Sequence, residues 1–75
     1  MLDPKQLKAL KKSAQREEWS AVGDTLRALS VQAVGSSVDR IRLQGLVPVI
    51  KQRNLEDLSW AVDELLRIQN YRDSD

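Results

Sequence analysis

The sequence predicts an all-α protein, a small antiparallel bundle of about four short helices that form two helical hairpins. Four segments carry apolar residues at intervals of three and four, the spacing of one helix face. No segment alternates apolar and polar residues long enough to form a half-buried strand. At 75 residues, with 41% hydrophobic and 31% charged residues, the chain suits a single globular domain over residues 1–75. Short connections favour antiparallel neighbours.

The first helix is expected from Pro4 to about Gln15, with a proline at the first helical position, where its missing N–H costs nothing. Asp3 is the expected N-cap, and Gln6 is placed to complete a capping box. Leu2 and Leu7 have the spacing of a hydrophobic staple. The apolar stripe of this helix is too narrow for a helix buried deep in a core, and it consists of Leu7, Leu10 and Ala14.

The second helix is expected to start near Glu18 and to carry a continuous apolar face. Residues on this face recur at helical spacing. They are Trp19, Val22, Leu26, Leu29 and Ala33. Gly35 follows the last apolar turn and predicts a left-handed stop. Ser36 or Ser37 then caps the third helix.

The third helix contains a proline, and the fourth has a clear beginning. Pro48 removes the N–H that would bond the carbonyl of Gln44, so a kink or restart is expected between Gly45 and Pro48. Asn54 is the expected N-cap of the fourth helix, which should fray near Tyr71 and leave a polar tail from about residue 72. The expected apolar face of the fourth helix is Leu55, Leu58, Val62, Leu65 and Gln69.

The composition excludes much of the chemistry of enzymes. The chain has no cysteine and no histidine, which removes disulfides, thiolate metal sites, cysteine nucleophiles and the commonest general base. Neighbouring carboxylates diverge by about 100° on a helix and do not form a pair. The sequence therefore predicts a protein without enzymatic activity, cofactor or metal. It lacks the roughly 18-residue apolar run of a membrane span and the apolar core of a signal peptide, so a cytoplasmic protein is expected.

Charge is distributed unevenly along the chain. Residues 1–16 hold five basic residues and one acidic residue, whereas residues 54–75 hold two basic and six acidic residues. These oppositely charged helices are expected to face each other within the bundle or between chains. Basic residues follow one line of the first helix, a possible face for nucleic acid or an acidic partner. They are Lys5, Lys8, Lys12 and Arg16. A solvated outer face is the favoured interpretation of this line.

Trp60 is the most informative single residue. It lies nearly opposite the apolar face of the fourth helix, with Arg67 and Tyr71 on the same line. Tryptophan, tyrosine and arginine are enriched at the centres of protein interfaces. The sequence therefore predicts partner binding through these residues, in an adaptor, regulator or assembly factor. The alternative is that the first helix covers Trp60.

Self-association is expected, as a two-fold homodimer. A chain of this size without a disulfide or metal obtains only about 3–5 kcal/mol of net stability from its core, and oligomerisation adds to it. Apolar residues remain after the core faces are assigned. Besides Trp60 and Tyr71, they are Ala21, Ala28 and Val31 on the far side of the second helix.

The run from Trp19 through Ile68 resembles the histidine-phosphotransfer (HPt) domains of bacterial phosphorelays. These are antiparallel four-helix bundles with a helix of the form H-x-L-K-G-S-(A/S), which corresponds here to residues 27–33, R-A-L-S-V-Q-A. Residues 35–40 resemble the turn that follows, and residues 52–56 the last hairpin. Arg27 stands in place of the phosphoacceptor histidine, Ser30 of the lysine and Val31 of the glycine. The resemblance thus implies a relative that does not transfer phosphoryl groups.

Overall fold

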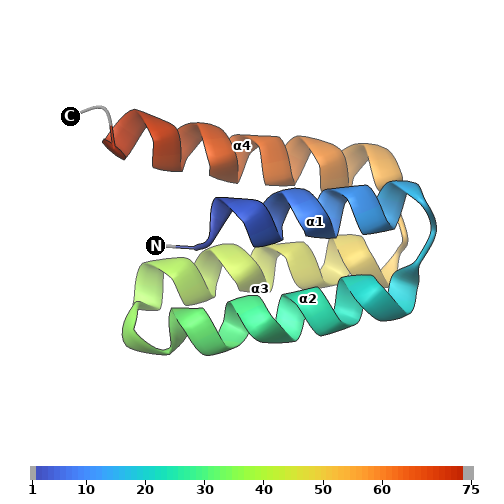
Figure 1. The fold of residues 1–75 in the computed structure, drawn as a ribbon, viewed down its shortest axis with the longest axis horizontal. Helices are drawn as coiled ribbons and strands as arrows, with labels where there is room; N and C mark the ends of the chain where they lie inside the picture. Colours follow the sequence, from blue (N-terminus) through green and yellow to red (C-terminus); the bar gives the residue numbers. More distant parts are fainter. Residues whose placement is uncertain (1, 74–75) are drawn as a thin grey trace.

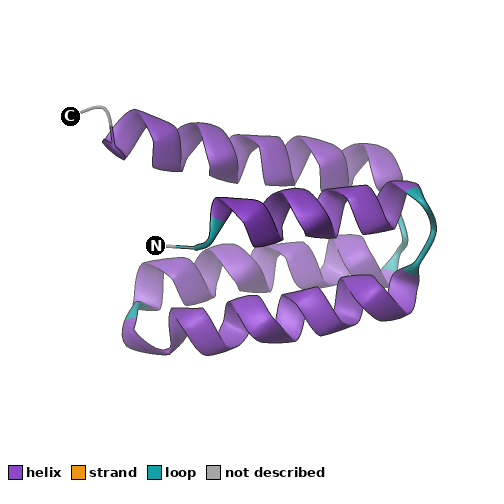
Figure 2. Ribbon diagram, viewed as in Figure 1, coloured by secondary structure: helices purple, strands orange, loops and turns teal. Residues whose placement is uncertain are grey.

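The structure, a computed structural model, describes the backbone of residues 2–73 and the side chains of residues 2–69. It is a bundle of antiparallel helices (Figure 1). In chain order the helices are α1 (Pro4–Gln15), α2 (Trp19–Gln32), the short 3-10 helix η1 (Ala33–Gly35), α3 (Ser37–Lys51) and α4 (Leu55–Asp73). No strand occurs in the described part of the chain (Figure 2). The predicted all-α class is confirmed.

The four long helices form a closed ring around one core. The backbones of α1 and α2, α2 and α3, α3 and α4, and α4 and α1 run close together, whereas those of the diagonal helices stay farther apart across the core. The α1–α2 and α3–α4 connections lie at one end of the bundle, and the α2–α3 turn lies at the other end with both termini (Figure 1). The predicted arrangement of two helical hairpins is therefore present.

The core is built mainly from leucine and valine on the inner faces of all four helices. The narrow stripe of α1 is completely buried, because α1 packs against both α2 and α4. A stripe of three residues is therefore sufficient for a helix held between two neighbours. The fully enclosed larger side chains are Leu2, Leu7, Leu10, Val22, Leu29, Leu46, Leu58 and Val62.

The N-terminus is attached to two distant helices. The side chain of Asp3 accepts a hydrogen bond from the Lys5 N–H at 2.9 Å, as an N-cap does. The backbone N–H of Asp3 donates to Gln32 Oε1 at the end of α2, at 3.2 Å. The expected capping box is therefore wrong, because a residue of another helix accepts the bond that Gln6 was expected to accept. One residue earlier, the Leu2 N–H donates to Gln69 Oε1 of α4 at 2.8 Å.

The α1–α2 corner turns through a residue in the left-handed region. Glu17 has φ 59°. Its N–H donates to the Ala14 carbonyl at 3.0 Å, and the Glu18 N–H donates to the Ser13 carbonyl at 2.9 Å. These two bonds define a Schellman motif, which satisfies carbonyls left free at the end of a helix.

The α3–α4 corner repeats this geometry 36 residues later with a different sequence. Arg53 has φ 53°. Its N–H donates to the Ile50 carbonyl at 3.0 Å, and the Asn54 N–H donates to the Val49 carbonyl at 3.3 Å. The Arg53 guanidinium also lies over the ring of Trp19, 5.5 Å from its centroid, and so links the two corners.

The left-handed stop expected at Gly35 is wrong, because none of the glycines has a positive φ. The chain tightens instead into η1, and the Ser36 N–H donates to the Ala33 carbonyl at 3.0 Å. Ser36 is the N-cap of α3, and its hydroxyl accepts a bond from the Asp39 N–H at 3.2 Å. A 3-10 turn thus replaces the expected left-handed glycine in the connection between α2 and α3.

The restart expected near Pro48 does not occur, since α3 continues unbroken from Ser37 to Lys51, and the kink stays a prediction. Gln44, Gly45 and Pro48 are all exposed, so the carbonyl that lacks its helical partner is on the side of the helix that water can reach. The fourth helix extends to Asp73, beyond the expected end near Tyr71. The polar tail expected from about residue 72 therefore begins inside this helix.

Candidate interaction surfaces

The outer face of α4 is centred on an exposed tryptophan. Trp60 is 68% exposed and lies on the side of α4 opposite the buried Leu58 and Val62. The alternative in which the first helix covers Trp60 is wrong. Helix α1 instead approaches the flank of α4, where Lys11 Nζ contacts the Asp63 carboxylate at 2.8 and 3.1 Å. The basic helix α1 and the acidic helix α4 therefore face each other within one bundle, and this ion pair joins them.

Four carboxylates surround Trp60 at intervals of three and four residues along α4. They are Glu56, Asp57, Asp63 and Glu64. Such spacing places them around the tryptophan on the same helix surface. Asp57 also accepts a bond from the Asn54 side chain at 2.9 Å, which completes the cap of α4. The outer face of α4 is thus a large aromatic residue within a negatively charged border.

Arg67 lies on this face and forms a two-bond pair with Glu64. Its Nε donates to Glu64 Oε1 at 3.1 Å, and its NH2 group donates to Oε2 at 2.7 Å. The hydrogen bond from Arg67 holds the pKa of Glu64 below its usual value, and the same bond raises the pKa of Arg67. Of the predicted binding residues, Trp60 and Arg67 share the exposed face. The side chain of Tyr71 lies outside the described residues.

The basic line of α1 is exposed along its whole length. Its members are Lys5, Lys8, Lys12 and Arg16, and all four side chains are exposed. Lys11 is not part of this line, because it points to the side and binds Asp63. The arrangement is a row of cations on a helix surface, separate from the outer face of α4.

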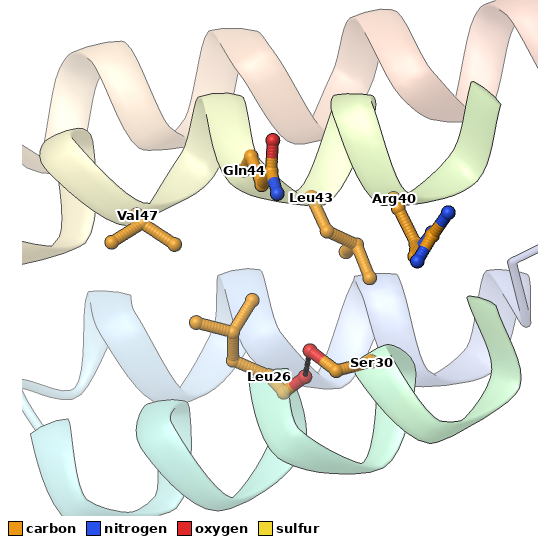
Figure 3. Close-up of a pocket in the computed structure, with 6 residues that line it drawn as sticks. All are labelled: Leu26, Ser30, Arg40, Leu43, Gln44 and Val47. Atoms are coloured by element: carbon orange, nitrogen blue, oxygen red, sulfur yellow. Dashed lines mark hydrogen bonds between the residues drawn. The ribbon is translucent and has the colours of Figure 1, made fainter. Parts of the chain in front are cut away.

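A pocket of about 220 Å³ lies between α2 and α3 (Figure 3). The close-up shows side chains from both helices converging on it. Its lining is Leu26, Ser30, Arg40, Leu43, Gln44 and Val47. Sequence reasoning missed this pocket. Its residues do recur at helical spacing on each helix, but the space between them depends on the separation of α2 and α3.

Exposed aliphatic residues gather at the α2–α3 turn. They are Val31, Val34, Val38 and Ile41, all at least half exposed. In the small apolar strip expected on α2, Val31 is 73% exposed, whereas Ala21 and Ala28 are half-buried. The exposed part of that strip is therefore confined to the turn.

The described residues contain no group of three or more side chains suited to a metal ion. None of the helices, over the part of the chain described, combines the length and hydropathy needed to cross a membrane. Arg27, which the resemblance to HPt domains aligns with the phosphoacceptor, is exposed on α2. Comparisons with protein-family models, characterised proteins and solved structures find no match, so that resemblance stays a prediction.

Proposed function

We propose that this chain is a non-enzymatic protein that binds another protein through the outer face of α4, as an adaptor, regulator or assembly factor. The observation that supports this proposal is the exposure of Trp60 on a helix whose inner face is fully packed. Covering a large aromatic side chain removes on the order of 150 Å² from water, or about 4 kcal/mol before the costs of association.

The charges around Trp60 determine which partner surfaces fit. Carboxylates at the rim of an interface contribute more to specificity and to the rate of encounter than to affinity. Asp63 and Glu64 already have basic partners within the chain, which leaves Glu56 and Asp57 as the exposed acids next to Trp60. The α4 face therefore favours a partner with an apolar recess and a basic border.

Affinity capture from the native host with the immobilised chain tests the proposal. A partner that uses the α4 face should be retained by the native chain and by Val31→Ala, which removes an aliphatic side chain of similar exposure. Trp60→Ala should weaken the affinity of the repurified partner at least about tenfold, as truncation of an interface centre does. Equal retention by Trp60→Ala would contradict the proposal.

Nucleic-acid binding through α1 is the second candidate, and the exposure of all four residues of the basic line favours it. Phosphate contacts release counterions, so the affinity should fall steeply as salt increases. Lys8→Glu combined with Lys12→Glu should abolish such binding and leave a Trp60-dependent protein complex intact. Titration of labelled single- and double-stranded DNA and RNA at several salt concentrations measures both effects. Affinity that does not change with salt would exclude this candidate.

A further inference from the structure

The size of the α2–α3 pocket limits what can occupy it. At about 220 Å³ it is smaller than the roughly 300–1,000 Å³ of sites for small molecules and cofactors. It is larger than the roughly 150 Å³ apolar cavity that accommodates benzene. The pocket therefore has room for one aromatic side chain rather than for a larger ligand.

The walls of the pocket are apolar and its border is basic. Three aliphatic residues line it, Leu26, Leu43 and Val47, and Arg40 lies among the polar residues at its edge (Figure 3). Helical spacing extends this positive charge, because Arg27 is three residues before Ser30 and Lys51 is four residues after Val47. Both are exposed. An occupant with an aromatic centre and an acidic border suits this site.

The outer face of α4 has these two properties. Trp60 supplies the exposed aromatic side chain, and Glu56 and Asp57, four and three residues before it, supply the negative border. The apolar pocket therefore matches the exposed aromatic side chain of the α4 face, and the two borders have opposite charge. Both surfaces belong to the same chain.

We propose that the occupant of the α2–α3 pocket is Trp60 of a second copy of this chain. This inference rests on the proposed function, since it uses the same α4 face and names its partner. The pocket lies between α2 and α3, whereas Trp60 points away from the core on α4, so the two sites lie on different sides of the bundle. The contact is then head-to-tail, and each added copy leaves one pocket and one Trp60 free. This geometry differs from the two-fold dimer expected from the sequence.

Sedimentation velocity over about a hundredfold range of concentration measures the association. The native chain should form species that grow with concentration and weaken at high salt. Trp60→Glu removes the inserted side chain, and Ser30→Trp fills the pocket from its edge. Ser30 is exposed and its hydroxyl bonds only the Leu26 carbonyl of its own helix, at 2.9 Å, so the bundle tolerates this change. Circular dichroism checks the folding of each variant.

Growth of the native chain beyond a dimer distinguishes a head-to-tail contact from a reciprocal one, and mixing the two variants tests whether Trp60 and the pocket are the two halves of that contact. Each variant alone should be monomeric. Together they should form a 1:1 complex, because one retains the pocket and the other retains Trp60. Val34→Glu is the matched control, with the same change of charge at an exposed apolar residue, and should associate like the native chain. Arg40→Glu replaces Ser30→Trp if the latter does not fold, and should weaken association at least about tenfold.

Three results would overturn the inference. They are a native chain that is monomeric throughout, an association that survives Trp60→Glu, and a mixture of monomeric variants that does not combine. None of these results tests the proposed function, which depends on whether Trp60→Ala reduces binding to a captured partner. If Trp60→Ala does not reduce that binding either, both the inference and the proposed function are wrong.

Discussion

The two helical hairpins close with the same corner geometry but differ in how they place their apolar residues. The inward residues of both hairpins are almost fully enclosed, such as Leu10 and Leu29 in the first and Leu58 and Val62 in the second. Among the described residues of the four long helices, the exposed large apolar residues are Val31 in α2 and Val38, Ile41 and Trp60 in α3 and α4. The two hairpins therefore contribute to the core alike, and the second carries more of the exposed apolar surface.

The corners themselves differ in how the next helix begins. At the α3–α4 corner, Asn54 Oδ1 accepts a bond from the Asp57 N–H at 3.1 Å, and its amide donates back to the Asp57 carboxylate. At the α1–α2 corner, Glu18 occupies the N-cap position and its side chain makes no capping bond. The same turn is therefore stabilised by side chains at one corner and mainly by backbone hydrogen bonds at the other.

The largest expected effect comes from truncating the enclosed leucines. Leu10→Ala and Leu29→Ala should each lower the free energy of unfolding by about 2–5 kcal/mol, because they leave cavities in a core that cannot collapse fully. Leu65→Ala in the second hairpin should lie toward the lower end of this range, since Leu65 is 8% exposed. Urea denaturation measures all three. Equal losses would show that the partial exposure of Leu65 does not reduce the cost of its truncation.

The next effect concerns the helix caps. Asn54→Ala should lower the free energy of unfolding by about 1 kcal/mol, because the first turn of α4 loses the acceptor for an N–H group. Glu18→Ala at the other corner should change it by less than about 0.5 kcal/mol, as an exposed residue without a capping bond does. Thermal unfolding of both variants is the measurement. A larger loss at Glu18 would show that the α1–α2 corner has a side-chain cap after all.

Substituting glycine at the two residues with a positive φ should stabilise the protein, whereas the substitutions above destabilise it. Glu17→Gly should raise the free energy of unfolding by about 0.5–1 kcal/mol, because glycine adopts a positive φ without the steric cost of a Cβ. Arg53→Gly should give a smaller gain, since it also removes the guanidinium over Trp19. Chemical denaturation compares the two. A greater gain at Arg53 would mean that this stacking contributes nothing.

The smallest effect is a local pH dependence on the outer face of α4. The pKa of Glu64 should lie below 4.5 because Arg67 donates hydrogen bonds to its charged form. With a lower pKa in the folded state, this pair stabilises the chain above the pKa of the unfolded state, and its contribution is lost as the pH falls through the folded value. Titration by carboxyl NMR measures the shift. Arg67→Ala should raise the pKa toward 4.5, and an unchanged value would show that Arg67 is not its cause.

Local signals in the sequence predicted much of the backbone. The bounds of α1, its N-cap at Asp3 and the caps at Ser36 and Asn54 agree with the structure, because each depends on hydrogen bonds within a few residues. The inner faces of the helices followed from helical spacing for the same reason. The outward position of Trp60 followed from that spacing as well, and its identity as a candidate binding residue required no tertiary information.

Only the tertiary structure decided what these local signals could not specify. Gln6 does not close the capping box because Gln32, distant in sequence, accepts the bond from Asp3. The residues with a positive φ are Glu17 and Arg53 rather than Gly35. The packing of the two helices in each hairpin holds the corner residue in this conformation despite its steric cost. Whether α1 covers Trp60, and whether a pocket opens between α2 and α3, depends on how four amphipathic helices share one core. Spacing along a chain determines which face of a helix is apolar, but the neighbours that cover each face are chosen by the packing of all the helices together.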